Sequence, residues 1–210
     1  MMLNLGCGHR HLLGWLNVDK RLECAPDQVL DLECVPWPWD DCIADRVALH
    51  HVLEHLGASS ETFLRVMQEL WRVCKDGTPI EITVPHPRAD EFLWDPTHVR
   101  PITAEGLRMF SQARNQQMIT DGNPETPLGL YIGVDFEIEN IKYRWHRRWR
   151  ERLARHEVTE AELSSIALSQ LNVISETTIC MLAVKPPRHS SGSAVQQSQS
   201  ELLHSLDRLP

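Results

Sequence analysis

The sequence has few of the features that would place a protein in a membrane, in an oxidising compartment or on nucleic acid. No apolar run approaches the roughly 20 residues that span a bilayer, and the six cysteines form no C-x-x-C pair. We expect no secretory leader, so the cysteines should be reduced thiols of a cytoplasmic protein. Acidic residues outnumber basic ones by 29 to 21, a net charge of −8, which disfavours a general nucleic-acid binder.

The cysteine pattern also gives no reason to expect a metal cofactor. Cys24, Cys34 and Cys42 are widely spaced, although His9 and His11 lie nearby in the sequence. Zinc sites normally draw their ligands from tightly spaced pairs. We therefore predict that the protein has no metal site.

What the sequence does contain is an ordinary globular composition with short alternating elements. Of its 210 residues, 42% are hydrophobic and 24% are charged, which is typical of one domain with a buried core. Apolar runs predict strands at 3–5, 15–18, 28–32, 46–50, 78–84, within 129–143 and at 177–185, and helical spacing predicts helices at 59–75, 103–112 and 149–170. The alternation of strand and helix indicates parallel strands with helical crossovers, hence an α/β fold.

The last part of the chain differs from the rest in composition. From residue 186 to residue 210 it includes the low-complexity stretch HSSGSAVQQSQS and has few apolar residues before Leu202. Such a segment cannot bury enough apolar surface to offset its ordering entropy. We expect one domain over 1–185, with a helical insertion at about 147–172, followed by a disordered tail over 186–210.

A glycine turn follows the first predicted strand. Gly6, Cys7 and Gly8 form it, and glycine lets a ligand approach the backbone because no side chain intervenes. Ligands of open α/β sheets bind beyond the carboxyl ends of the strands. Asp19 ends the second predicted strand at that same edge, where its carboxylate can accept hydrogen bonds from both hydroxyls of a ribose. The pattern predicts a cofactor that contains a nucleoside; the alternative is a purely structural turn.

A dinucleotide fits this stretch less well. The G-x-G-x-x-G pattern that opens a pyrophosphate-binding helix lacks its third glycine here. The interval between Gly8 and Asp19 is also too short for a full crossover helix and a strand. A cofactor without phosphates is therefore the better interpretation.

Five motifs over the first half of the chain extend this pattern. They are LNLGCG at 3–8, GWLNVD at 14–19, DLE at 31–33, DRVALHHVLEHL at 45–56 and PHPRADEFLWDPTHVRPIT at 85–103. In their order and spacing the sequence resembles the class I S-adenosylmethionine-dependent methyltransferases, in particular a compact branch with an LNLGCG and GWLNVD opening. The resemblance implies a Rossmann-like sheet of mostly parallel strands with an antiparallel C-terminal strand. It implies S-adenosyl-L-methionine as the cofactor.

The resemblance also assigns residues to parts of that cofactor. It implies that the glycine turn lines the methionine part, that Asp19 holds the ribose with Lys20 beside it, and that His50 and His51 face the cofactor and the substrate mouth. The positions near adenine would be Asp31 and Leu32. The segment 9–13 replaces the usual helix after the turn, and we expect no N-terminal helix over the site. The strand at 177–185 would be the inserted one, paired with a strand at 136–143.

Candidates for the chemistry follow the fourth and fifth predicted strands. Methyl transfer from a sulfonium is an in-line displacement, so positioning of the acceptor contributes much of the rate, and a hydroxyl acceptor also needs a base. His98 and Asp95 in WDPTHVR, and His51 in the HHVLEH stretch, are the predicted catalytic residues. Each has an alternative structural role, and for Glu54 and His55 we expect the structural one.

The acceptor is less constrained than the cofactor. The resemblance implies a small-molecule or glycan-like acceptor. One alternative is a catalytically silent cofactor-binding scaffold that acts through a protein partner. The other is a nucleic-acid methyltransferase that uses the basic segment 142–155, KYRWHRRWRERLAR, although the net charge and the absence of an NPPY-type motif disfavour it. We interpret that segment more simply as a solvated helix face.

Overall fold

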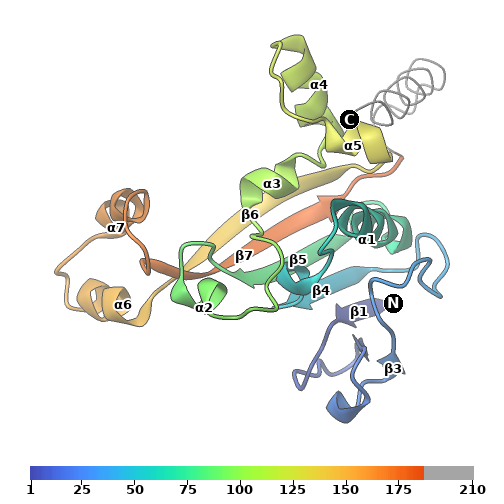
Figure 1. Cartoon of the computed structure of the whole chain (residues 1–210), viewed down its shortest axis with the longest axis horizontal. Coiled ribbons are helices and arrows are strands. Elements are labelled where there is room, and N and C mark those ends of the chain that lie inside the picture. The colour runs from blue at the N-terminus through green and yellow to red at the C-terminus, as the bar shows by residue number, and fades with distance from the viewer. Residues whose placement is uncertain (187–210) are drawn as a thin grey trace.

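A computed structural model describes residues 1–186 as a seven-stranded sheet with helices, shown in Figure 1. The strands lie in the order β3-β2-β1-β4-β5-β7-β6, and β7 alone runs opposite to the other six. Their bounds are β1 (Met2–Leu5), β2 (Leu16–Asp19), β3 (Gln28–Val29), β4 (Arg46–His50), β5 (Pro79–Pro85), β6 (Phe136–Trp145) and β7 (Ile174–Ala183). The prediction of a mostly parallel sheet with an antiparallel C-terminal strand is confirmed.

Seven α-helices and two 3-10 turns connect these strands within the described residues. The helices are α1 (Ser60–Val73), α2 (Asp90–Leu93), α3 (Ala104–Arg108), α4 (Gln112–Thr120), α5 (Leu128–Ile132), α6 (Arg147–Ala154) and α7 (Glu160–Ala167). The turns are η1 (Leu22–Cys24) and η2 (Leu53–His55). None of these helices is long and apolar enough to cross a membrane. The tail expected over 186–210 lies outside the described residues from 187 onward.

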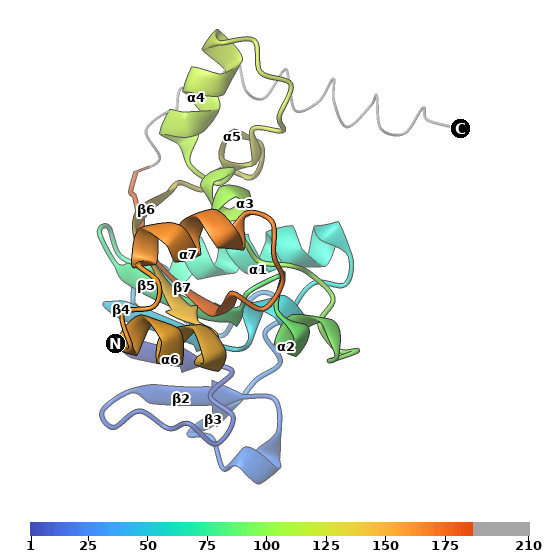
Figure 2. The same ribbon diagram turned by 90° about the vertical axis from the view of Figure 1, so that its left-hand side faces the viewer.

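The main core lies between the sheet and α1. Ser59 caps this helix by accepting a hydrogen bond from the Thr62 N–H group, and an apolar stripe that includes Met67 and Leu70 is buried. Figure 2 shows α1 and α3 on one side of the sheet. The opposite face is polar and partly open, with Glu81 exposed beside Cys180. No helix joins β1 to β2, which explains why this part of a parallel sheet is less covered than usual.

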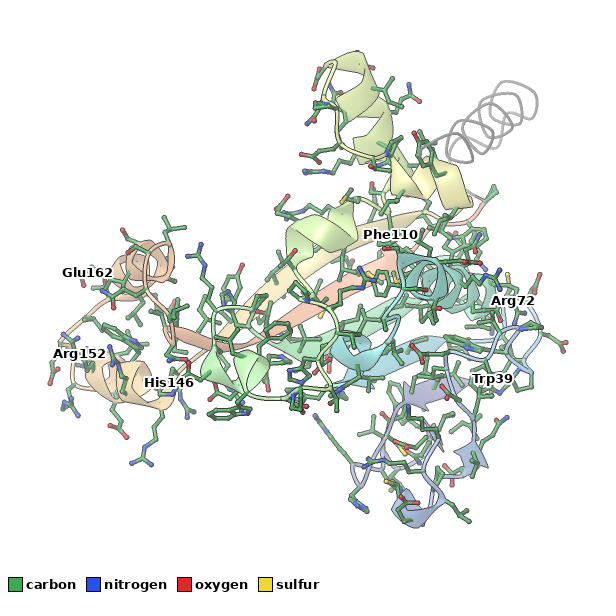
Figure 3. All side chains as sticks on the ribbon, in the orientation of Figure 1. Trp39, Arg72, Phe110, His146, Arg152 and Glu162 are labelled. Atoms are coloured by element: carbon green, nitrogen blue, oxygen red, sulfur yellow. The ribbon has the colours of Figure 1, made fainter. Side chains whose placement is uncertain are left out.

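A partly buried ion pair fixes the loop after β3 to the end of α1. The Glu69 carboxylate accepts the Trp37 N–H at 2.6 Å and the Arg72 guanidinium at 2.7 Å and 2.8 Å. Arg72 also donates to the Trp39 carbonyl oxygen at 2.8 Å, and both residues are labelled in Figure 3. Burial alone would raise the pKa of the Glu69 carboxyl, but the hydrogen bonds from Arg72 and Trp37 outweigh it and lower that pKa.

This lowered pKa predicts an acid-sensitive contribution to stability. The folded state binds a proton at Glu69 less readily than the unfolded chain, whose glutamate pKa is about 4.3. The contribution is therefore fully present above that value and is lost as the pH falls through the lower, folded value. We expect the free energy of unfolding of the wild type to fall more steeply between about pH 5 and pH 3 than that of Glu69→Gln. Denaturant titrations across this range measure both slopes, and parallel slopes would contradict the assignment.

Three predicted elements differ in the structure. The helix predicted at 103–112 is two helices, because Thr103 caps α3 and Ser111 caps α4 with a change of direction between them. At that change the Phe110 carbonyl oxygen accepts the Phe136 N–H at 3.1 Å, which ties the break to the start of β6. The strand-rich segment predicted at 129–143 begins as helix α5, and β6 starts only at Phe136.

The third difference is the helical segment between β6 and β7, which is a pair of short helices. Thr159 and Glu162 form a capping box that starts α7 after a break. Trp149, Val158 and Leu163 are buried in a small core of their own. The pair lies beyond the ends of β6 and β7 (Figures 1 and 3), and Arg88 attaches it to the loop after β5 by donating to the Ala167 and Leu168 carbonyl oxygens.

Candidate functional site

The turn after β1 is bound to the end of β2 by two hydrogen bonds. The Cys7 N–H donates to the Val18 carbonyl oxygen at 2.8 Å, and the Gly8 N–H donates to the Asp19 carboxylate at 2.7 Å. Gly6 has φ of 64° and Gly8 has φ of 50°, both in the left-handed region. Both positions favour glycine for their backbone conformation. Only Gly6 is also crowded, since an added Cβ would lie 2.4 Å from a methyl carbon of Val52.

Alanine substitutions should separate these two effects. Gly8→Ala should cost about 1–2 kcal/mol, because its Cβ meets no atom closer than 3.5 Å and only the backbone is strained. Gly6→Ala should cost about 2–5 kcal/mol, because the overlap with Val52 adds to the same strain. Adding Val52→Ala to Gly6→Ala should recover part of that loss. Urea unfolding of the four proteins measures these differences, and equal costs at the two glycines would contradict the argument.

Beside the turn lies a cavity of about 420 Å³, here called the Asp19 cavity. It lies at the carboxyl ends of β1, β2 and β4. Its walls contain Gly6, Asp19, Lys20, Arg21, Leu30, Asp31, Leu32, His51, Val52, His55, Leu56 and Thr97. The structure thus brings together five of the predicted cofactor residues and His51. It adds residues that no pattern pointed to, among them Val52 and Thr97.

Asp19 is nearly buried and already has two backbone partners. Besides Gly8, the Arg21 N–H donates to its carboxylate at 2.9 Å. Burial alone would raise the pKa of the Asp19 carboxyl, but the N–H groups of Arg21 and Gly8 outweigh it and lower that pKa. The group is therefore an ionised acceptor, and a carboxylate has about four lone-pair sites, so it can still accept ligand hydroxyls.

Three predicted cofactor residues, Cys7, Gly8 and His50, are not part of the cavity wall. The Cys7 side chain is buried, and burial raises the pKa of its thiol. His50 lies on the open face of the sheet, where its Nε2 atom is 3.5 Å from a carboxylate oxygen of Glu81, and burial lowers its pKa. The structure therefore does not support the expectation that His50 faces the cofactor.

A second cavity of about 260 Å³, here called the His98 cavity, adjoins the first. Its walls contain His51, Glu54, His55, Pro85, Glu91, Asp95, His98, Arg144, Ser175 and Glu176. All three predicted catalytic residues, His51, Asp95 and His98, are among them. His51 and His55 line both cavities. The sequence predicts a structural role for His55, but the structure places it in both walls.

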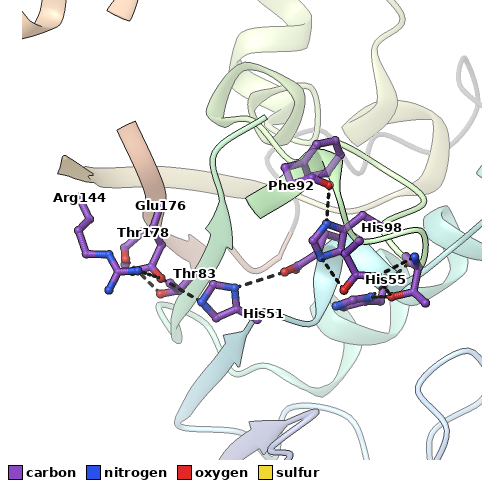
Figure 4. Close-up of polar contacts among 11 residues, drawn as sticks. His51, His55, Thr83, Phe92, His98, Arg144, Glu176 and Thr178 are labelled. Carbon is purple, nitrogen blue, oxygen red and sulfur yellow. Dashed lines mark hydrogen bonds and ion pairs between the residues drawn. The ribbon is translucent and has the colours of Figure 1, made fainter. Parts of the chain in front are cut away.

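His51 lies at the junction of the two cavities (Figure 4). Its φ of 55° is in the left-handed region, a strained conformation that is common at functional sites. Its Nδ1 atom is 3.5 Å from Glu54, and its Nε2 atom is 2.9 Å from Glu176. The neighbouring carboxylates, Glu54 first, raise the pKa of the imidazole against the opposing effect of burial.

His98 is more enclosed than His51. Its ring stacks on Phe92 at 5.2 Å and its Nδ1 atom is 2.8 Å from the Phe92 carbonyl oxygen, a contact drawn in Figure 4. Its Nε2 atom is 3.7 Å from Asp95. The Thr97 hydroxyl and N–H groups hold the pKa of Asp95 below its ordinary value.

The basic segment 142–155 has one exposed aromatic side chain, that of Tyr143. Trp149 is buried in the core of the α6–α7 pair. Several of the charges are paired on the surface: Arg147 with Glu151, and Arg152 and Arg155 with Glu157. This arrangement agrees with a solvated helix face packed on its own small core.

Comparisons with known proteins identify the fold. No family model matches the sequence, and neither does any curated protein. Among solved structures, a SAM-dependent methyltransferase from Archaeoglobus fulgidus is 19% identical over 86% of this chain and 85% of its own, with a TM-score of 0.54. A Haloferax volcanii methyltransferase bound to the Trm112 activator is 15% identical over 90% and 83%, with a TM-score of 0.48. A Mesorhizobium loti methyltransferase is 15% identical over 86% and 90%, with a TM-score of 0.46. Together with the strand order, the first of these shows that the chain has the class I methyltransferase fold.

Proposed function

We propose that the protein is an S-adenosylmethionine-dependent methyltransferase that binds its cofactor in the Asp19 cavity and its acceptor in the His98 cavity. One observation carries this proposal: five cofactor residues assigned by resemblance line a single cavity at the carboxyl edge of the sheet, namely Gly6, Asp19, Lys20, Asp31 and Leu32. This is the edge at which α/β folds bind their ligands. One fold hosts many different reactions, so the proposal rests on the residues of the site and not on the fold.

The cofactor is proposed to lie across the ends of β1 and β2. Gly6 presents bare backbone toward the methionine part, and Asp19 accepts the ribose hydroxyls with its remaining lone pairs. The Asp31 carboxylate supplies a hydrogen-bond acceptor for the adenine amine, and the Leu32 side chain supplies an apolar surface for the ring. No helix follows the glycine turn, so the site offers no helix N-terminus to a pyrophosphate, and a cofactor without phosphates suits it better than a dinucleotide.

The acceptor is proposed to be a hydroxyl-bearing small molecule or the end of a glycan. The His98 cavity is small and its wall is rich in carboxylate and imidazole groups, which bind hydroxyls. His51 lies between the two cavities, where it can hold the acceptor oxygen in line with the methyl–sulfur bond and accept its proton. Asp95 and His98 would orient the acceptor from the far wall.

Nucleic acid is a weaker candidate for the acceptor. The net charge of −8 opposes it, and of the aromatic side chains in the basic segment that could stack on bases, Trp149 is buried and Tyr143 is exposed. A catalytically silent scaffold stays the main competitor, because a loop at 9–13 replaces the helix that usually follows the glycine turn.

An acceptor screen tests the proposal. The full chain is incubated with S-adenosylmethionine and a panel of saccharides, nucleosides, small alcohols and oligonucleotides, and S-adenosylhomocysteine is quantified. We expect turnover with at least one hydroxyl-bearing compound and none with oligonucleotides. Tight S-adenosylhomocysteine binding without turnover on any compound would instead support the scaffold.

A further inference from the structure

Glu54 is a buried carboxylate that lacks the partners such a group needs. It lies on the turn η2, its side chain is 0% exposed, and neither carboxylate oxygen has a hydrogen-bond partner among the described residues. The nearest basic side chain is His51, whose imidazole Nδ1 lies 3.5 Å from a Glu54 carboxylate oxygen. Removing an ionised carboxylate from water is costly unless a positive charge or hydrogen-bond donors compensate it. The surroundings of Glu54 therefore point to a cation.

Two imidazoles lie next to this carboxylate. The rings of His55 and His98 are 4.7 Å apart between centroids. One ligand atom from each of Glu54, His55 and His98 lies within 4.8 Å of the others, and residues 1–186 hold no second group of three such residues. None of the cysteines discussed above as possible metal ligands belongs to this cluster.

Hydrogen bonds determine which nitrogen of His98 is free. Its Nδ1 atom is 2.8 Å from the Phe92 carbonyl oxygen, which can only accept. Nδ1 therefore carries the hydrogen, and in the neutral ring Nε2 carries the lone pair.

The same reasoning applies to His55. Its Nδ1 atom is 3.0 Å from the Thr97 hydroxyl oxygen and 3.2 Å from the Thr97 carbonyl oxygen. The hydroxyl proton is already donated to the Asp95 carboxylate at 2.6 Å, so both Thr97 oxygens accept from His55. A histidine whose Nδ1–H is held by a carbonyl or hydroxyl, with Nε2 free, is the usual arrangement of a metal ligand.

We propose that Glu54, His55 and His98 bind a divalent first-row transition metal ion, with the acceptor supplying a further ligand. Two imidazole nitrogens and one carboxylate oxygen suit zinc, cobalt, manganese or iron better than calcium or magnesium. Ligand atoms around tetrahedral zinc are about 3.3 Å apart, so side-chain adjustments of about 1.5 Å or less would close the cluster. The backbone is already fixed, because the Glu54 carbonyl oxygen accepts the Val99 and Arg100 N–H groups from the loop that carries His98.

The metal site lies close to the place of the proposed methyl transfer. The suggestion that the acceptor is a metal ligand rests on that proposed function. His55 lines both cavities, so the ion would lie where the acceptor meets the cofactor. A Lewis acid there would bind an acceptor hydroxyl and lower its pKa. The oxygen then forms the new C–O bond as the methyl–sulfur bond breaks, S-adenosylhomocysteine leaves, and the hydroxyl proton leaves through His51 to solvent.

Direct binding of cobalt and zinc tests the site without any turnover. The full chain is treated with EDTA, desalted, and titrated with CoCl₂ by visible absorption and with ZnCl₂ by calorimetry, with and without S-adenosylhomocysteine. We expect one ion per chain. Glu54→Gln and His98→Asn should each bind at least tenfold more weakly, whereas His156→Asn, a change at an exposed residue between α6 and α7, should bind as the wild type does.

Thermal unfolding separates loss of the ligand from loss of the fold. Glu54→Gln keeps the side-chain shape and replaces a buried carboxylate whose oxygens accept no hydrogen bond from the described residues, so in EDTA it should melt no lower than the wild type. Zinc should raise the melting temperature of the wild type and of His156→Asn but not that of Glu54→Gln. Equal cobalt binding by Glu54→Gln and the wild type, or no stoichiometric binding, would overturn the metal proposal. If the chain bound S-adenosylhomocysteine but no metal, the proposed cofactor would stand and the metal site would fall. If the chain bound metal but no S-adenosylhomocysteine, only the metal site would stand.

Discussion

Asp19→Ala should weaken the binding of S-adenosylhomocysteine by about ten- to a hundredfold. The lost contact between a carboxylate and two ribose hydroxyls accounts for about 1.5–3 kcal/mol. The structure adds a second effect, because Asp19 also accepts the N–H groups of Gly8 and Arg21 and so holds the glycine turn against β2. The variant should therefore also unfold at a lower temperature. Calorimetry and thermal unfolding measure the two effects.

A variant with a similar stability loss elsewhere separates these effects. Glu69→Gln weakens a partly buried ion pair with Arg72 and the contact of α1 with Trp37 in the loop after β3, outside both cavities. It should lower the melting temperature and leave S-adenosylhomocysteine affinity within about twofold of the wild type. If both variants lost S-adenosylhomocysteine affinity in proportion to their loss of melting temperature, the proposed contact between Asp19 and the ribose would be wrong.

His51→Asn should lower kcat by about 10²–10⁴ with the best acceptor from the screen, the usual contribution of a positioned proton acceptor. Asparagine tolerates the left-handed conformation of this position, so the backbone should be retained. His51 is the junction between the cavities, and its loss should act on the reacting geometry more than on cofactor binding. S-adenosylhomocysteine affinity should change by less than about threefold. Steady-state kinetics and calorimetry give both numbers.

The chain supplies a closely matched control for this change. His156 also has a left-handed backbone, with φ of 56° against 55° for His51, but it is exposed between α6 and α7. His156→Asn repeats the chemical change in the same backbone conformation, and kcat should be unaltered. A drop of less than about threefold in His51→Asn would show that His51 is structural and would make His98 and Asp95 the next candidates.

The glycine turn and the ends of the strands could be predicted because local chemistry determines them. The turn needs left-handed backbone, and Asp19 ends a strand at the ligand-binding edge whatever packs around it. The spacing between Gly8 and Asp19 also correctly excluded a crossover helix. These features depend on residues that are close together in the sequence.

Other features depend on contacts that the sequence pattern does not carry. His50 and His51 are adjacent, yet one lies near Glu81 on the open face and the other at the cavities, because the strand alternates and the chain turns left-handed at His51. The isolation of the Glu54 carboxylate appears only when η2 packs under the loop that carries His98. The break after α3 likewise coincides with a hydrogen bond that the Phe136 N–H group, distant in the sequence, donates to the Phe110 carbonyl oxygen.

Titration of the full chain with S-adenosylhomocysteine in a calorimeter tests the central claim most directly. The account predicts saturable binding of one molecule per chain in the Asp19 cavity, weakened about ten- to a hundredfold in Asp19→Ala. It also predicts that NAD, titrated under the same conditions, binds far more weakly, because no helix follows the glycine turn between β1 and β2 to receive a pyrophosphate. No measurable heat with S-adenosylhomocysteine at millimolar concentration, or equal binding by Asp19→Ala, would contradict the account.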